Sequence, residues 1–190
     1  GSQVLGYYEP HADVMVLIDG GAAAALPARM VWAHEMAHAA QERRFRLPSR
    51  LLGMRDSGDA QRAASAVAEG EAMLVMVLLD APVGAAETAL ATAEQAIALQ
   101  ASTFQAPAGI PDYFVQDLLF PYSAGFAAVL RRNREAGWDG VDTLLRSPPT
   151  TTAALLYPHL AGTGAAVEDG ALPDPPDGWE EVLTDTFGAW

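Results

Sequence analysis

The segment VWAHEMAHAAQERRF, residues 31–45, constrains the fold and chemistry of this chain more than any other part of it. It contains the pattern His-Glu-x-x-His at His34, Glu35 and His38. Residues four apart lie on one face of a helix, so the two imidazoles can bind one metal ion, and Glu35 is placed to reach a water molecule on it. The segment therefore predicts a helix carrying two zinc ligands and a general base.

The alternative is an alanine-rich helix with two surface histidines. The context favours the metal, because the neighbouring side chains are mostly apolar or small and predict a buried stretch. Burying two histidines and a glutamate without polar partners is unfavourable by several kcal/mol, and a metal ion supplies a partner. Zn²⁺ is the cofactor that this pattern predicts.

A catalytic zinc site normally has three protein ligands and one open position. The metzincin arrangement needs glycine and histidine where this chain has Gln41 and Arg44, so that class is excluded. The segment AVAEGEAML, residues 66–74, offers Glu69 or Glu71 on a second helix. These two lie about 200° apart around a helix, so only one can face the ion.

We prefer Glu69 as the third ligand, because small residues share its helix face and would let the two helices approach closely. Glu71 lies on the opposite side with apolar residues, where an ion pair with an arginine is expected. Asp56 and Asp59 are weaker candidates and are interpreted as turn and helix-capping residues.

Hydrolysis through a tetrahedral intermediate also requires a hydrogen-bond donor for the oxyanion. Tyr122, in FPYSAGF, is the first candidate and His159, in LLYPHL, the second; Tyr113 and Tyr157 are further ones. Each is alternatively a core or turn residue. His11, in a predicted turn, is expected to be exposed.

The chain is expected to be mostly helical, with a small β-element at its start. LGYY and VMVLI read as two strands joined by the turn EPHAD, and Gly20 and Gly21 end the hairpin. The second strand could bind an extended peptide or simply pack on the metal-binding helix.

Predicted helices span about 27–46, 59–79, 85–100, 112–137 and 138–147, with a short one after residue 150; Pro121 should begin a new helix after a break. Residues 162–178 read as an exposed loop.

The composition of the chain limits which kinds of binding partner and metal ligand are expected. A formal charge of -13 repels phosphate backbones and anionic lipid, so we expect no nucleic-acid binding. The longest apolar run, residues 72–79, is much shorter than the roughly 20 residues that span a bilayer. There is no cysteine, which rules out disulfides and thiolate ligands. At 190 residues, one domain over 1–190 is expected; the opening Gly-Ser, typical of a cleaved tag, and the abrupt end at Trp190 leave room for truncation at both ends.

HEMAH followed by AEGEA resembles the gluzincin branch of the zincin metallopeptidases, whose third ligand is a glutamate on the next helix. In its aminopeptidases that glutamate lies in an Asn-Glu-Gly-aromatic-Ala segment, and this match places Glu69 at the ligand position. The chain also resembles a group of bacterial HExxH proteins that carry GYYEP, AHEMAHAAQERRF, AVAEGEA, FPYSAGF and GWDGVDTLL-x-SPPTTT in this order. That resemblance implies a zincin-like α+β fold, with the hairpin packed on the HExxH helix, and a metal site, but no particular substrate.

The chain also departs from that family. Thermolysin-like members place an aspartate where this chain has Met73, so any residue that orients a histidine must come from elsewhere. The segment that captures a substrate amine in aminopeptidases is also missing. We therefore expect a zinc-dependent endopeptidase acting on a peptide or protein, with the cell envelope or secretion favoured over the cytoplasm. A zinc-binding protein without peptidase activity is the alternative, and hydrolysis of a non-peptide amide, such as a cell-wall bond, is a third possibility.

Overall fold

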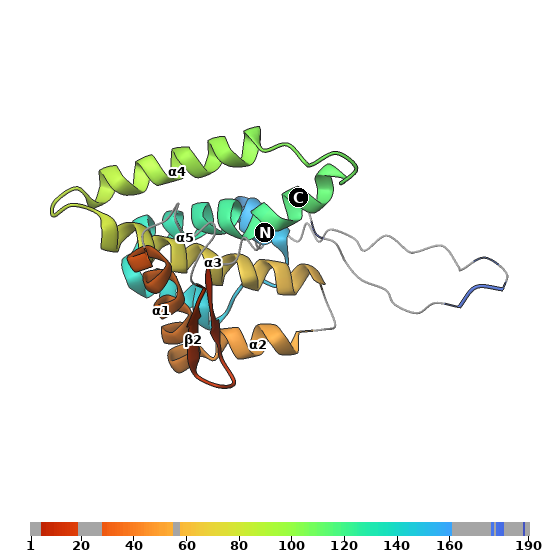
Figure 1. The fold of residues 1–190 in the computed structure, drawn as a ribbon, viewed down its shortest axis with the longest axis horizontal. Coiled ribbons are helices and arrows are strands. Elements are labelled where there is room, and N and C mark those ends of the chain that lie inside the picture. Colours follow the sequence, from red (N-terminus) through yellow and green to blue (C-terminus); the bar gives the residue numbers. More distant parts are fainter. Residues whose placement is uncertain are drawn as a thin grey trace.

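The computed structural model describes residues 5–18, 28–54 and 58–160, together with residues 176, 178–180 and 188. The elements follow in the order β1 (Gly6–Glu9), β2 (Val14–Leu17), α1 (Ala28–Phe45), α2 (Leu47–Gly53), α3 (Gly58–Asp80), α4 (Ala86–Thr103), α5 (Asp112–Arg146), α6 (Thr152–Leu156) and a 3₁₀ turn at Pro158–Leu160 (Figure 1). The described chain is thus mostly helical with one two-stranded antiparallel sheet, as the sequence predicts at this coarse level.

The core lies around α3, which packs on α5 along much of its length. At the centre of this contact two glycines face each other. A Cβ atom on Gly70 would lie 2.4 Å from the carbonyl carbon of Gly125, and one on Gly125 would lie 2.1 Å from the carbonyl oxygen of Ala66. The two backbones therefore touch, and fully buried side chains such as Leu74 and Phe126 complete the core around them.

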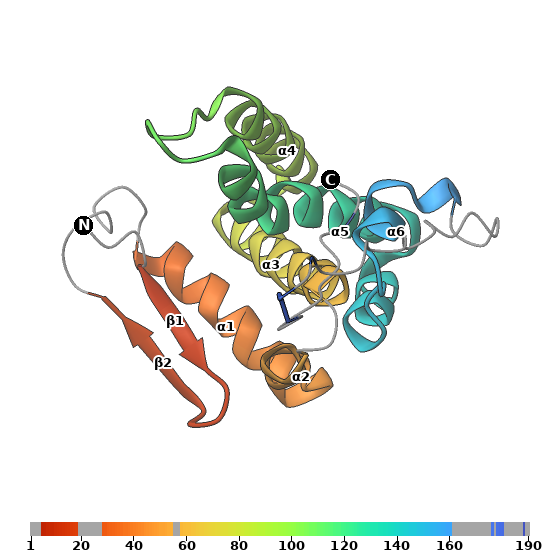
Figure 2. The same ribbon diagram turned by 90° about the vertical axis from the view of Figure 1, so that its right-hand side faces the viewer.

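The helix α1 lies between α3 and the β-hairpin (Figure 2). The hairpin pairs Tyr7 with Val16, and β1 is the strand with more contacts to α1. A Cβ atom on Gly6 would lie 2.9 Å from the Val16 carbonyl oxygen and 3.1 Å from a Val31 methyl group, so this glycine lets the strand lie close to the helix. The predicted packing of the hairpin on the HExxH helix is present.

The expected helix break at Pro121 is wrong. The helix α5 continues through Pro121 with helical backbone angles, and it is interrupted instead at Ala136 and Gly137, where Gly137 has φ +60°. Proline removes one backbone donor but does not forbid a helix. Buried neighbours on this helix, Phe120 and Phe126, hold the continuous segment against the core. The predicted short helix from Trp138 is the part of α5 that follows the interruption.

The expected capping role of Asp59 is also wrong. Asp59 lies inside the first turn of α3 and is buried, and its carboxylate accepts hydrogen bonds from the Thr152 backbone N–H at 2.9 Å and the Thr152 hydroxyl at 2.6 Å. It therefore fastens α6 to the start of α3, while Thr151 caps α6 by accepting from the Ala154 N–H.

Several expected features lie outside the described residues: Gly20, Gly21, the first residue of the helix expected over 27–46, Asp56 and most of the 162–178 loop. Within the described part of the chain, no helix combines the length and the apolar character needed to cross a membrane.

Candidate metal centre

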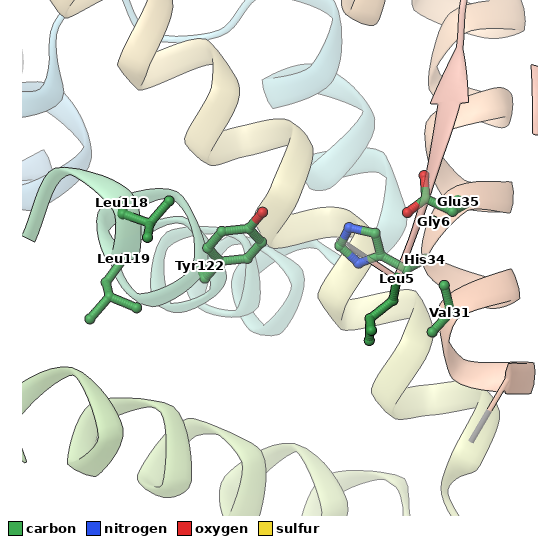
Figure 3. Close-up of a pocket in the computed structure, with 8 residues that line it drawn as sticks. All are labelled: Leu5, Gly6, Val31, His34, Glu35, Leu118, Leu119 and Tyr122. Carbon is green, nitrogen blue, oxygen red and sulfur yellow. The ribbon is translucent and has the colours of Figure 1, made fainter. Parts of the chain in front are cut away.

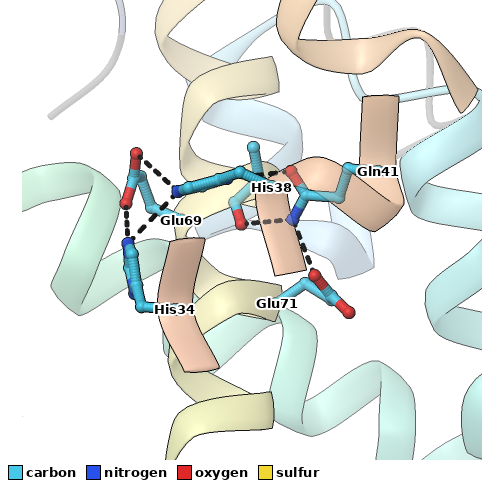
Figure 4. A network of polar contacts seen from close by, with 6 residues as sticks. His34, His38, Gln41, Glu69 and Glu71 are labelled. Carbon is cyan, nitrogen blue, oxygen red and sulfur yellow. Dashed lines mark hydrogen bonds and ion pairs between the residues drawn. The ribbon is translucent and has the colours of Figure 1, made fainter. Parts of the chain in front are cut away.

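His34, His38 and Glu69 meet where α1 crosses α3 (Figure 4). The Nε2 atom of His34 lies 3.1 Å from Oε2 of Glu69 and 3.2 Å from Nε2 of His38. The His38 Nε2 atom lies 3.6 Å from Oε1 of Glu69. The cluster is largely shielded, with side-chain exposures of 17%, 13% and 21% for His34, His38 and Glu69. One ligand-type atom from each of the three residues lies within 4.8 Å of the other two.

The backbone explains this convergence. His34 and His38 are four residues apart on α1, so both rings lie on the helix face turned toward α3. The structure brings Glu69, and not Glu71, to both imidazoles. Not all of the HExxH stretch is buried, however: Val31, Ala33, Glu35 and Ala37 are buried, whereas the side chains of Trp32 and Met36 are exposed.

Charge couples the three side chains in the metal-free protein. Burial alone would lower the pKa of the His38 imidazole, but the hydrogen bonding and negative charge of Glu69 outweigh it and raise that pKa to about 9. Burial likewise tends to raise the pKa of Glu69, but its hydrogen bonds with His34 and His38 lower it to about 2. Without a metal, a protonated His38 therefore pairs with an ionised Glu69 at neutral pH.

A further polar group, the side-chain amide of Gln41, contacts His38. Gln41, which is 2% exposed, places Oε1 3.1 Å from Nδ1 of His38, while its Nε2 donates to the Ala68 carbonyl at 2.9 Å and to Glu71 at 2.6 Å (Figure 4). The expected pairing of Glu71 with an arginine is wrong, since among the described residues its hydrogen-bond partner is the Gln41 amide. Burial raises the pKa of Glu71. This role of Gln41 was not predicted from the sequence, where the residue only distinguished the chain from the metzincins.

Glu35 and Tyr122 both line a cleft beside the cluster (Figure 3). The cleft has a volume of about 420 Å³, and its lining includes His34 and Glu35 on α1 and Tyr122 on α5. The rest of the lining is Leu5, Gly6, Val31, Leu118 and Leu119. Burial and the charges of Glu69 and Glu35 raise the pKa of Tyr122 to about 12, so its hydroxyl keeps its proton and can donate.

The other predicted candidates lie elsewhere. His159 is exposed in the 3₁₀ turn beside Tyr157, with ring centroids 6.3 Å apart, and the described lining of the cleft includes neither. Tyr113 packs edge-on against Phe114 at the start of α5. His11 is exposed in the hairpin turn, as expected. The strand that reaches the cleft is β1, at Gly6, rather than β2.

No family model, curated protein or solved structure matches this chain. A functional interpretation therefore depends on the chemistry of the residues that the fold brings together.

Proposed function

We propose that this protein is a zinc-dependent metallopeptidase of the gluzincin type that cleaves peptide bonds within a chain. The observation that carries the proposal is that His34, His38 and Glu69 converge, with Glu35 and Tyr122 on the adjoining cleft. The HExxH pattern alone supplied only the residues of α1. The third candidate ligand and the tyrosine come from two other helices, so the arrangement depends on the fold.

The donor set and its spacing suit zinc. Two imidazole nitrogens and one carboxylate oxygen form a common catalytic zinc ligand set, with bonds of about 2.0–2.2 Å in a tetrahedral arrangement. Such bonds place neighbouring ligand atoms about 3.3 Å apart. In the cluster the two imidazole nitrogens lie 3.2 Å apart, and each lies near a different oxygen of Glu69, at 3.1 Å for His34 and 3.6 Å for His38. To hold an ion, the Glu69 carboxylate would have to bring one oxygen close to both nitrogens, and His34 also lines the adjoining cleft.

Two residues of the cleft have separate tasks, proton transfer for Glu35 and hydrogen-bond donation for Tyr122. A zinc ion held there would polarise the scissile carbonyl and lower the pKa of a water molecule. The carboxylate of Glu35 would accept the proton of the attacking water and pass it to the amide nitrogen as the C–N bond breaks. The Tyr122 hydroxyl would donate a hydrogen bond to the oxyanion, since its raised pKa keeps the proton in place.

The lining of the cleft favours an endopeptidase. Apart from His34, Glu35 and Tyr122 it is apolar, and Glu35 is the one carboxylate among the described residues that line it. An aminopeptidase needs a further acidic group for the substrate's terminal amine. An apolar cleft in a protein with a net charge of -13 suits neutral or basic peptides with apolar side chains.

One observation favours a second candidate, a zinc-binding protein without peptidase activity. The three cluster side chains join α1 to α3, so a zinc ion held by them could link these two helices without any substrate. The position of Glu35 argues against it, because a structural zinc site needs no base on an adjoining cleft.

The deciding experiment combines metal analysis with a peptide-library assay. The wild-type protein should hold one zinc ion per chain and cleave internal bonds. Glu35→Gln should keep the zinc but lose activity by about 10²–10⁴-fold, the usual contribution of a general base. His38→Ala should lose both, and Glu135→Gln, at an exposed position on α5, should change neither. Zinc binding with no peptide cleavage would leave the second candidate, and a wild-type protein without zinc would end both.

A further inference from the structure

We infer that Gln41 is the residue that positions His38 for metal binding. This inference rests on the proposed zinc site, but it concerns how the chain prepares one ligand rather than what the site cleaves. The sequence left open which residue orients a histidine, since Met73 stands where thermolysin-like proteins have an aspartate. The side-chain amide of Gln41 fills this role from the same helix as His38.

The hydrogen bonds fix which way the amide faces. The Ala68 carbonyl can only accept, so the group that faces it at 2.9 Å must be the NH₂ of Gln41. The second proton of that NH₂ points to the Glu71 carboxylate at 2.6 Å. Both donors are thereby used on the α3 side, and the remaining amide oxygen must face His38.

The amide in turn fixes the imidazole. Because Oε1 of Gln41 accepts, the His38 Nδ1 atom that lies 3.1 Å away must carry a proton. The free lone pair of a neutral His38 is then on Nε2, the atom that lies beside His34 and Glu69. An outer partner of this kind typically sets both the tautomer and the ring orientation of a zinc-binding histidine.

Gln41 also connects the two ligand-bearing helices. Ala68, whose carbonyl it binds, directly precedes Glu69, so one side chain joins His38 on α1 to the backbone beside the third candidate ligand on α3. At 2% exposure the amide is shielded from water that could replace these bonds. The distance between the ligands is thus maintained by a residue that would never touch the ion.

The test compares variants of Gln41 by zinc affinity and by the visible absorption of the cobalt-loaded protein. Gln41→Met keeps the size of the side chain but removes all three hydrogen bonds, so zinc affinity should fall by about 10–100-fold and the cobalt spectrum should change. Gln41→Glu alone would set a carboxylate against that of Glu71, so the acceptor is restored in the double variant Gln41→Glu with Glu71→Gln, which keeps an acceptor for the His38 N–H and should recover much of the affinity. Glu71→Gln keeps an acceptor for Gln41 and should bind zinc like the wild type.

A pure packing role would give a different pattern. In that case Gln41→Met would bind zinc as tightly as the wild type with an unchanged cobalt spectrum, or the double variant Gln41→Glu with Glu71→Gln would be no better than Gln41→Met; either result overturns the inference. Should Gln41→Met fail to fold, nitrogen NMR of the zinc-loaded wild-type protein still decides. We expect His38 to bind through Nε2 with a proton on Nδ1, and binding through Nδ1 would refute the assignment.

These outcomes separate this inference from the proposed function. If zinc binds and depends on Gln41 as described but no peptide is cleaved, the peptidase proposal fails and the positioning role stands. If peptides are cleaved and Gln41→Met keeps full affinity, the reverse holds. A wild-type protein that binds no zinc would overturn both.

Discussion

The helix α3 crosses two other helices, and adjacent residues on it serve contacts of opposite character. Glu69 faces α1 and takes part in the polar cluster with His34 and His38. Gly70 faces α5 and touches the backbone of Gly125. We call these the metal crossing and the glycine crossing. The first is built from groups that titrate and can bind an ion, whereas the second is built from close packing alone.

This difference assigns separate tasks to the two crossings. The glycine crossing sets the distance between α3 and α5, and so places Tyr122 on the same cleft as His34 and Glu35 of α1. The metal crossing should respond to pH and to metal content. The two crossings, and the cleft that Tyr122 lines, can each be altered separately by mutation.

The largest effect should come from Gly125→Leu. The first added carbon would already lie 2.1 Å from the Ala66 carbonyl oxygen, so α3 and α5 must separate. We expect the free energy of unfolding to fall by more than about 4 kcal/mol, a loss seen when a core is disrupted. Thermal or urea unfolding measures it, and zinc should not restore the loss. The control is Gly53→Leu, where an added Cβ meets nothing within 4 Å. Equal stability of the two variants would refute the backbone contact.

Tyr122→Phe should distinguish the packing role of the ring from the hydrogen-bonding role of the hydroxyl group. The ring keeps its place in the cleft, but the donor to the oxyanion is lost, so kcat should fall by about 10²–10³-fold with little change in stability or zinc affinity. Phe114→Leu, at an exposed position on the same helix, serves as the control and should keep full activity. If kcat is unchanged in Tyr122→Phe, another group stabilises the oxyanion.

Zinc should stabilise the metal crossing and leave the glycine crossing as it is. At a free zinc concentration of 100 times Kd, a ligand that binds only the folded state stabilises it by about 2.7 kcal/mol. Glu69→Gln should lose most of this gain, because it removes the charged ligand at nearly constant shape. Glu71→Gln should keep the gain. Thermal unfolding with and without zinc tests it, and equal gains in the two variants would show that Glu69 is not a ligand.

The sequence predicted those features that depend on local periodicity. The four-residue spacing places His34 and His38 on one face, and the helical wheel separates Glu69 from Glu71, as in the structure. The turn residues between two β-prone runs similarly predicted the hairpin. What failed or was missed depends on partners far along the chain. Asp59 binds Thr152, 93 residues away, and the role of Gln41 depends on a carbonyl of another helix.

The helix interruption in α5 shows the same limit. A proline is a strong local signal for a break, but Pro121 lies on a segment whose packing against the core keeps it helical. The actual interruption, at Gly137, uses the conformational freedom of glycine at φ +60°. The local sequence identifies residues at which a helix can be interrupted, and tertiary packing determines at which of them the interruption occurs.

The last prediction is a pH dependence of stability that belongs to the metal crossing. In the metal-free protein the folded-state pKa of His38 is about 9, above its ordinary value of 6.5, so the stability from its pairing is complete below pH 6.5 and is lost as the pH rises through 9. The folded-state pKa of Glu69 is about 2, below its ordinary 4.5, so its contribution is complete above pH 4.5 and is lost as the pH falls through 2.

The pairing should therefore stabilise the metal-free protein most between about pH 4.5 and 6.5. Subtracting the stability curve of His38→Gln from that of the wild type isolates this term from other titrating groups. With zinc bound, the ion replaces the proton on His38, so the loss of stability above pH 6.5 should disappear. A difference curve that is flat from pH 5 to 9 without zinc would mean that His38 and Glu69 do not form a charged pair. The metal crossing would then resemble the glycine crossing, because packing would stabilise it and its stability would not depend on pH.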